Sequence, residues 1–274
     1  MKQELIIRHF AKTSRDMWDR GWAEANGGNI SLRLNDEQHA ATADCQPRSE
    51  WLPLPVNVSS LSRERFVLTG TGRYLRNVEM SPERNIGIIE LNDSGDAYRI
   101  LWGFEPNGRP TSELSAHLLS HAAIKASTNN YAHAVIHTHS PSLIALTYAF
   151  ANLSSAVLST LLWRMHAECV VVFPQGVEFL PWMMAGSNEL GEATVAALLK
   201  RTLVAWEHHG IVGTGRNLDE AFGRIYVAEK AAGIYLACAG VGGVKKVLTD
   251  NQLQAIAANF KCDMDKSLLA SWPS

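Results

Sequence analysis

The apolar and polar residues of the chain follow two periods, one typical of helices and one typical of strands. Between Gln3 and Gly21 the apolar residues recur at near-helical spacing, which predicts a helix. Residues 30–34 alternate apolar and polar side chains, which predicts a strand. The same patterns predict helices at 112–127, 141–151, 188–201, 217–239 and 252–260, a short helix after Ser81-Pro82, and strands at 65–69, 86–91, 97–102, 134–139, 170–173, 203–206 and 210–213.

The order of these elements indicates a mixed α/β fold. Asn92-Asp93-Ser94-Gly95 separates two predicted strands and is typical of a hairpin turn. Residues 36–63 show no clear period and contain three prolines, so they are expected to be irregular. Since no repeat or linker stands out, we expect a single domain over residues 1–274, with a mainly antiparallel central β-sheet flanked by helices on both faces.

Composition excludes several classes of protein. The chain has 274 residues, of which 46% are hydrophobic, and a formal net charge of −2, which argues against a nucleic-acid or membrane-surface binder. The first 22 residues mix charged side chains, among them Lys2, Glu4, Arg8, Lys12 and Asp16, with apolar ones, so they do not resemble a signal peptide. No stretch approaches the ~18 apolar residues of a membrane span. Four scattered cysteines without a CxxC pair predict reduced thiols and a cytoplasmic location.

Candidate chemistry centres on His137-Thr138-His139, at the end of the apolar run Ala134-Val135-Ile136. In an extended strand, residues two apart project from the same face, so these two imidazoles are expected to point the same way. Two buried polar rings on one face require partners. A divalent metal ion is one such partner, and Zn²⁺ is the commonest ion bound by neutral histidine nitrogens.

A catalytic zinc site needs a third protein ligand and an open position. We expect His209 to be this ligand, since Gly210 after it permits close approach of the backbone. His208 is the alternative, although in an extended segment it would face the other way. His117 and His121, four residues apart on a predicted helix, remain a lesser possibility, as does His166.

Glu113 is a candidate general acid/base. It stands in Pro110-Thr111-Ser112-Glu113-Leu114, at the predicted start of a helix, where the helix dipole favours a carboxylate. An ordinary first-turn glutamate would look the same in the sequence.

Two short glycine-rich loops are candidates for binding an anion. Asn26-Gly27-Gly28-Asn29 and Thr69-Gly70-Thr71-Gly72-Arg73 combine exposed backbone N–H groups with side-chain donors. Neither matches a P-loop or a dinucleotide fingerprint, and a plain turn explains either one alone. Together, beside a metal site, they indicate a phosphorylated small molecule.

Taken in order, these motifs resemble the class II aldolase/adducin family of zinc sugar-phosphate aldolases. The likeness covers nearly the whole chain. It rests on Asn26-Gly27-Gly28-Asn29, Thr69-Gly70-Thr71-Gly72, Pro110-Thr111-Ser112-Glu113, His137-Thr138-His139, the run from Ala167 to Pro174, and His209-Gly210. Within the family, the chain length and the segment between Asn35 and Glu64 fit the rhamnulose-phosphate branch better than its shorter relatives.

The resemblance implies a C4 homotetramer with active sites at subunit interfaces and one Zn²⁺ per subunit. It implies that His137, His139 and His209 bind the zinc and that Glu113 is the catalytic glutamate. It also implies that Glu168 acts from the neighbouring subunit. The phosphate and substrate loops would comprise Asn26, Gly28, Asn29, Thr71, Gly72 and Ser112.

The reaction implied is reversible retro-aldol cleavage of a phosphorylated ketose, with L-rhamnulose 1-phosphate as the expected substrate. A Schiff-base mechanism is disfavoured because no lysine lies in the matching motifs. Three alternatives remain open: another sugar-phosphate aldolase of the fuculose type or a pentulose-phosphate 4-epimerase, a non-catalytic adducin-like scaffold, and a zinc hydrolase.

Overall fold

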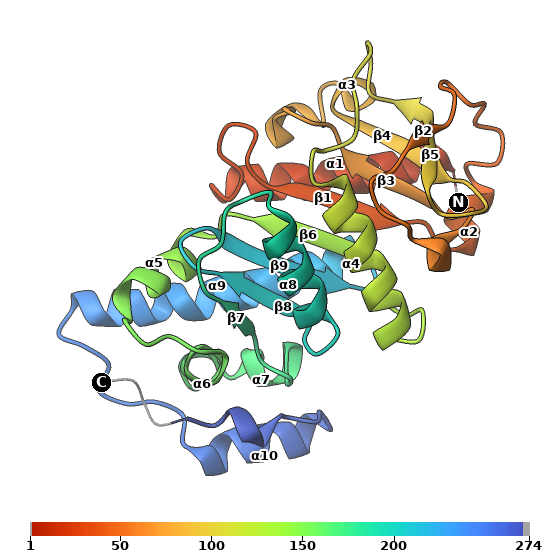
Figure 1. Ribbon diagram of the computed structural model, residues 1–274. Helices are drawn as coiled ribbons and strands as arrows, with labels where there is room; N and C mark the ends of the chain where they lie inside the picture. The colour runs from red at the N-terminus through yellow and green to blue at the C-terminus, as the bar shows by residue number, and fades with distance from the viewer. Residues whose placement is uncertain (1, 271–274) are drawn as a thin grey trace. The chain divides into compact units, whose positions relative to one another are not determined.

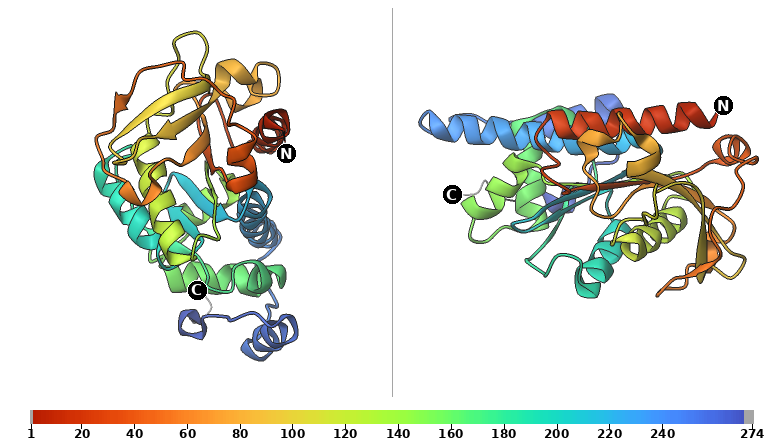
Figure 2. Two further views of the ribbon diagram at one scale, coloured as in Figure 1. Left: turned by 90° about the vertical axis from the view of Figure 1, so that its right-hand side faces the viewer. Right: turned by 90° about the horizontal axis from the view of Figure 1, so that it is seen from above.

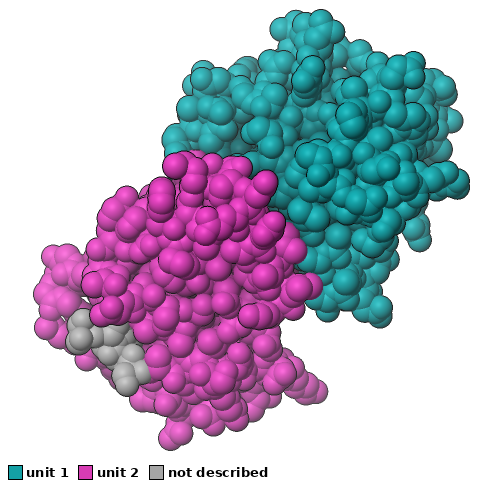
Figure 3. All heavy atoms as spheres, viewed as in Figure 1, with its two compact units in different colours: residues 1–138, 214–221 teal, residues 139–213, 222–274 magenta. Residues whose placement is uncertain are grey.

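The protein is described by a computed structural model that places residues 2–270. These residues form two compact units, which Figure 3 distinguishes by colour. Of the described residues, unit 1 comprises 2–138 and 214–221, and unit 2 comprises 139–213 and 222–270. Each unit has its own sheet strands and covering helices, described in turn below.

The strands of unit 1 form an antiparallel sheet in the order β2-β5-β4-β3-β1-β6 (Figure 1). Its strands are β1 (Asn29–Arg33), β2 (Leu52–Pro53), β3 (Arg65–Thr69), β4 (Ile86–Leu91), β5 (Ala97–Gly103) and β6 (Ala134–Thr138). Its helices are α1 (Gln3–Asp19), α2 (Asp36–Ala40), α3 (Pro82–Asn85) and α4 (Leu114–Ser127), with the short 3₁₀ turns η1 (Ser59–Leu61) and η2 (Leu75–Asn77).

Two helices cover this sheet, and each buries apolar side chains against it. α1 and α4 lie on opposite faces of the unit 1 sheet (Figure 2). The buried residues of α1 include Ile6, Phe10 and Met17, spaced four and seven residues apart as one helix face requires. On α4, Leu114 and Leu118 join a core cluster built on β3, β4 and β5.

The register of three neighbouring strands determines which side chains meet at one edge of the unit 1 sheet. β1 pairs with β6 so that Asn29 lies opposite His137, and with β3 so that Ser31 lies opposite Leu68. Since all these pairs are antiparallel, the start of β1 lies beside the ends of β3 and β6. The loops that precede β1 and follow β3 therefore open at the same edge as His137.

In unit 2, β8 (Leu203–Trp206) pairs with residues 210–213 of β9 (Gly210–Gly215) in antiparallel fashion and with β7 (Glu178–Leu180) in parallel. The remaining elements are α5 (Pro141–Ala149), α6 (Ser155–Met165), α7 (Glu168–Val172), α8 (Asn188–Leu198), α9 (Leu218–Gly240), α10 (Asp250–Phe260) and η3 (Lys266–Leu268). Of these, α9 begins in unit 1. Trp163 on α6 is fully buried, and its indole N–H donates to the carbonyl oxygen of Phe173 at 3.2 Å.

Most of the elements expected from the sequence are confirmed, with ends shifted by a few residues. One prediction is wrong: residues 170–173 do not form a strand, because residues 168–172 make the short helix α7. A four-residue apolar run suits a buried helix turn as well as a strand, and period alone cannot separate them. Helix α6 was not predicted, and the segment 36–63 contains short pieces of structure: α2, β2 and η1. Among residues 2–270, no helix combines the length and the apolar character needed to cross a bilayer.

Candidate metal centre and the loops around it

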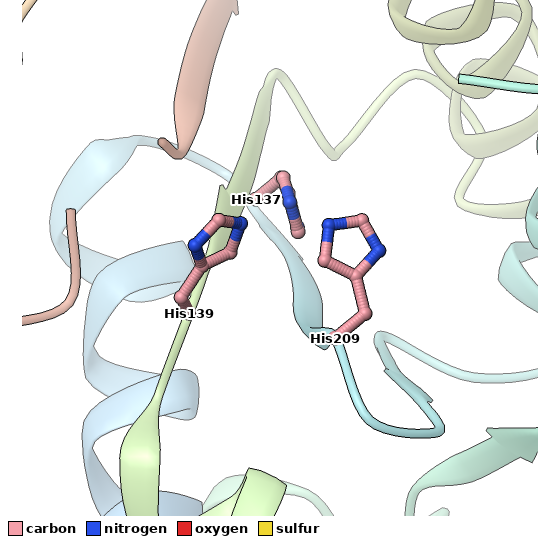
Figure 4. Close-up of side chains that lie close together, drawn as sticks. All are labelled: His137, His139 and His209. Carbon is pink, nitrogen blue, oxygen red and sulfur yellow. The ribbon is translucent and has the colours of Figure 1, made fainter. Parts of the chain in front are cut away.

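Three histidines lie close enough to share one metal ion. His137, His139 and His209 each offer one ring nitrogen, and these nitrogen atoms all lie within 4.8 Å of one another. Figure 4 shows the three side chains gathered from two segments far apart in the sequence. The rings of His139 and His209 have centroids 5.2 Å apart and are tilted by 53°. The structure thus brings together the three histidines that the sequence favours.

Local backbone geometry separates His209 from its neighbour His208. Residues 207–209 form the turn between β8 and β9, where the N–H of His209 donates to the carbonyl oxygen of Trp206. His208 adopts φ +58°, so the segment is not extended there. The His208 ring stacks on Tyr148 at 4.0 Å, and its Nδ1 lies 3.1 Å from the Thr147 hydroxyl. His208 is therefore held against α5 by these contacts, outside the three-histidine cluster.

The glycine-rich loop before β1 packs directly against the strand that carries His137. Gly28 has φ +74°, a conformation that favours glycine. A Cβ atom there would also lie 3.1 Å from the carbonyl oxygen of His137 and 3.3 Å from Met17. Gly28 thus lets this loop approach the backbone of the candidate metal ligand.

Three motifs expected to bind phosphate or substrate converge in unit 1. The N–H of Thr71 donates to the carbonyl oxygen of Arg109, and Gly70 forms an isolated bridge with Pro110. These contacts hold the loop after β3 beside the loop before α4. Asn26, Thr71, Gly72 and Ser112 are exposed, as donors for a ligand must be, whereas Asn29 is buried.

Glu113 lies within this group of loops and is tied to β1. It occupies the N-cap position of α4, and its carboxylate accepts a hydrogen bond of 2.9 Å from the side-chain amide of Asn29. Asn29 is the cross-strand partner of His137, and residues directly opposite in an antiparallel pair project to the same face. The contact therefore brings a carboxylate to the face of the sheet from which His137 projects.

His117 and His121, the lesser metal candidates, have a different role in the structure. His117 Nδ1 and His121 Nε2 lie 2.6 and 2.7 Å from the Ser31 hydroxyl, and His117 Nε2 contacts the side-chain oxygen of Asn29. Both rings are buried and neither belongs to the three-histidine cluster. Burial lowers the pKa of His117 to about 4, although the nearby Glu113 charge opposes the shift. Burial, with repulsion from neighbouring cationic groups, lowers the pKa of His121 well below its usual value.

Two further glutamates belong to unit 2. Glu168 is exposed at the start of α7, and its backbone N–H donates to Nδ1 of His166. Glu229 on α9 is buried and accepts hydrogen bonds of 2.9 Å from the backbone N–H groups of Ser142 and Leu143, at the start of α5. Burial raises the pKa of Glu229 even though these bonds favour the charged form. No sequence pattern points to Glu229, because nothing marks one glutamate in the middle of a long helix.

The sequence of the chain matches one family over most of its length. The model of the class II aldolase and adducin N-terminal domain matches residues 8–236. The chain belongs to this family. Its aldolases are metal-dependent, and the His137, His139 and His209 cluster offers this chain a site for such an ion.

Named relatives cover almost the same length. A rhamnulose-1-phosphate aldolase of Listeria monocytogenes is 40% identical over 93% of both chains. A rhamnulose-1-phosphate aldolase of Escherichia fergusonii is 41% identical over 94% of both. Among solved structures, a sugar-phosphate aldolase from Thermotoga maritima superposes with a TM-score of 0.74 at 30% identity, covering 87% of this chain and 96% of that one.

The donor set suits a catalytic metal ion. Three neutral imidazoles are one of the ligand sets that catalytic zinc sites use, and they leave a coordination position for water or substrate. His137 is buried, while His139 and His209 are partly exposed.

Because burial lowers the pKa values of His117 and His121, we predict that the protein loses stability in mild acid. Unfolded histidine binds a proton near pH 6.5, whereas folded His117 does so only near pH 4. Between these values the unfolded state binds more protons, so the free energy of unfolding should fall as the pH falls, by at most about 1.4 kcal/mol per pH unit for each such group. Urea unfolding of chelator-treated protein at pH 7 and pH 5 measures this.

Two histidine variants test this assignment, one at a buried histidine and one, as the control, at a partly exposed histidine. His121→Gln should reduce the difference in unfolding free energy between pH 7 and pH 5, whereas His39→Gln, at a partly exposed histidine of α2, should not. An identical pH dependence in wild type and His121→Gln would contradict the assignment of the effect to the buried pair.

Proposed function

We propose that the chain is a metal-dependent aldolase that reversibly cleaves L-rhamnulose 1-phosphate to dihydroxyacetone phosphate and L-lactaldehyde. The observation that carries the proposal is the match at about 40% identity, over more than nine tenths of both chains, to proteins named rhamnulose-1-phosphate aldolase. The site supplies the matching parts: three clustered histidines, a carboxylate on the His137 face of the sheet, and exposed glycine-rich loops.

His137, His139 and His209 would hold the ion, and neutral imidazoles with an open position favour Zn²⁺, one per subunit. When bound, the ion supplies positive charge that stabilises the negative charge developing on the substrate oxygens as the C3–C4 bond breaks. Glu113 protonates C3 of the enediolate fragment during cleavage and removes that proton during condensation. The amide of Asn29 holds the Glu113 carboxylate in place through a 2.9 Å hydrogen bond.

The loops of unit 1 would bind the phosphate group. The exposed donors of Asn26, Thr71, Gly72 and Ser112, together with the backbone around Gly28, suit a phosphate better than the buried side chain of Asn29 does. Fixing the phosphate converts remote binding energy into orientation of the reacting carbons.

We also propose that the protein is a homotetramer with active sites at its subunit interfaces. Glu168, exposed at the start of α7, would act in the active site of a neighbouring subunit of a homotetramer, taking the proton from the C4 hydroxyl as the aldehyde forms and returning it in condensation. The chain would form a single class II aldolase domain, with a mainly antiparallel sheet between two layers of helices.

Removal of the metal should abolish cleavage. We expect purified protein to release dihydroxyacetone phosphate and L-lactaldehyde from L-rhamnulose 1-phosphate, to lose this activity after chelation, and to regain it with added Zn²⁺. Coupled dehydrogenases measure each product. Conversion to another ketose phosphate without aldehyde release would indicate an epimerase, and undiminished cleavage after exhaustive chelation would contradict the metal role.

The two adjacent histidines of the β8–β9 turn offer a matched pair for this assay. His209→Ala should lose both bound metal and activity, because it removes one of the three clustered nitrogens. His208→Ala should keep its metal, because the His208 ring packs against Tyr148 and Thr147 instead. Metal analysis of both purified variants checks this, and loss of metal from His208→Ala alone would reverse the assignment.

Glu113→Ala should retain the metal but lower kcat by roughly 10²–10⁴-fold, the range typical of a positioned acid/base. Glu79→Ala, at an exposed glutamate of the same unit, is the control and should change kcat little. Steady-state kinetics and metal content measure both. A Glu113→Ala enzyme with near-normal kcat would remove Glu113 from the mechanism.

Mixed oligomers test whether Glu168 acts across a subunit interface. Glu113→Ala and Glu168→Ala should each be impaired as pure variants. When the two are unfolded and refolded together, some active sites receive Glu113 from one subunit and Glu168 from its neighbour, so activity should rise above that of either variant. No gain in verified mixed oligomers would place both glutamates in the same subunit's site or exclude Glu168 from the reaction.

A further inference from the structure

The hydrogen bonds around Glu113 continue into a buried chain of polar side chains that the proposed reaction does not use. Glu113 accepts from Asn29, Asn29 contacts His117, and His117 and His121 both contact Ser31. All five residues belong to unit 1. Four of them, Asn29, Ser31, His117 and His121, are at most 8% exposed. A buried polar network of this kind is costly unless its members are paired, so its members are held in defined orientations.

The charge on Glu113 determines the direction of every hydrogen bond in the chain. An ionised carboxylate can only accept, so the NH₂ group of Asn29 faces Glu113 and its oxygen faces His117. His117 must then carry its proton on Nε2, to donate to that oxygen, and must accept at Nδ1 from the Ser31 hydroxyl.

His121 is the last member of this chain of hydrogen bonds. Because the Ser31 hydroxyl donates its proton to His117, Ser31 oxygen accepts from Nε2–H of His121. His121 Nδ1 is then an unprotonated acceptor, and it has no hydrogen-bond partner among the described residues. With every bond reversed, this buried nitrogen would carry an unpaired N–H, and buried unpaired donors are rarer than unpaired acceptors. Both ends of the chain therefore favour the same direction.

Both imidazoles can keep these roles because they stay neutral. Burial keeps the pKa of each ring below its usual value, so neither becomes a cation that donates from both nitrogens near neutral pH.

We infer that His117, supported by Ser31 and His121, is a positioning residue that fixes the Asn29 amide with its NH₂ group toward Glu113 and so aligns the Glu113 carboxylate for proton transfer at the substrate carbon. This inference rests on the proposed function. It assigns the Asn29 side chain to Glu113 rather than to the phosphate, which distinguishes it from the loop role expected from the sequence. His117 itself touches neither substrate nor metal in this assignment.

Kinetics of three variants test the positioning role. His117→Leu removes the donor to Asn29 and should lower kcat by about 10-fold or more, because small misplacements of a catalytic group are costly, while KM changes less than about 3-fold. His117→Gln keeps a side-chain N–H donor and should recover most of the lost kcat. His133→Leu removes a half-buried histidine of the same unit, whose Nδ1 bonds to the Arg33 carbonyl oxygen, and should leave kcat near wild type.

Metal content and thermal unfolding are measured on each variant. All three should retain the metal, since His117 lies outside the three-histidine cluster. A folded His117→Leu enzyme with unchanged kcat would overturn the inference, as would a higher KM with unchanged kcat, which would assign Asn29 to the phosphate. Loss of metal from His117→Leu would make His117 a ligand and would also overturn it. If His117→Leu fails to fold, the kinetics of His117→Gln and the ring-nitrogen NMR shifts of the wild-type protein still test the positioning role.

The tautomers of the two rings provide a readout that does not depend on activity. In ¹⁵N-histidine-labelled, zinc-loaded wild type near pH 7, ring-nitrogen NMR shifts should show His117 and His121 neutral and protonated on Nε2. Protonation of His117 on Nδ1 would overturn the inference whatever the kinetics. The protein could also show Nε2 protonation of both rings but no cleavage of L-rhamnulose 1-phosphate. That result would support the oriented network and contradict the proposed function.

Discussion

The antiparallel pairing of Asn29 with His137 is the constraint on which the site in unit 1 depends. Residues directly opposite each other in such a pair project to the same face, so the register that places His137 in the three-histidine cluster also faces Asn29 and Ser31 toward α4. A slip of one residue would turn all of β1 over and move the partner of Glu113 to the other face. Gly28 reinforces this register, because its positive φ and its missing side chain allow the loop to approach the His137 carbonyl oxygen.

Histidine serves two distinct purposes in this fold, and the surroundings decide which. His139 and His209 are partly exposed and gather with His137 so that their nitrogens can share an ion. His117 and His121 project from α4 and are buried against β1, where desolvation lowers their pKa values and hydrogen bonds orient both rings. A neutral imidazole donates at one nitrogen and accepts at the other, so a buried pair can transmit orientation along a chain of side chains.

Backbone contacts in unit 2 hold the other two clustered histidines. His209 lies in a turn that depends on His208 adopting a left-handed conformation, and Thr147 accepts the backbone N–H of His208. His139 is followed closely by α5, whose first N–H groups are bound by the buried carboxylate of Glu229. A helix N-terminus left without partners would be costly, and a buried carboxylate satisfies two of its donors at once.

The sequence by itself determined the elements with a strong period and the pair of histidines that one strand places on the same face. His137 and His139 are two residues apart on a strand, so their shared face follows from backbone geometry alone. The antiparallel hairpin of β4 and β5 followed from its turn residues. Glu113 was recognisable only as a glutamate at a helix start, and its importance came from the family resemblance.

Only the tertiary structure decided that His209, and not His208, joins the three-histidine cluster. That outcome depends on the left-handed conformation of His208 in the turn and not on a strand period. It also decided that residues 168–172 form a helix, since a short apolar run fits either state until its neighbours are known. The bond from Asn29 to Glu113 spans 84 residues, and that between Ser31 and His121 spans 90. No local pattern encodes such contacts, because they arise from strand register and from the packing of α4 on the sheet.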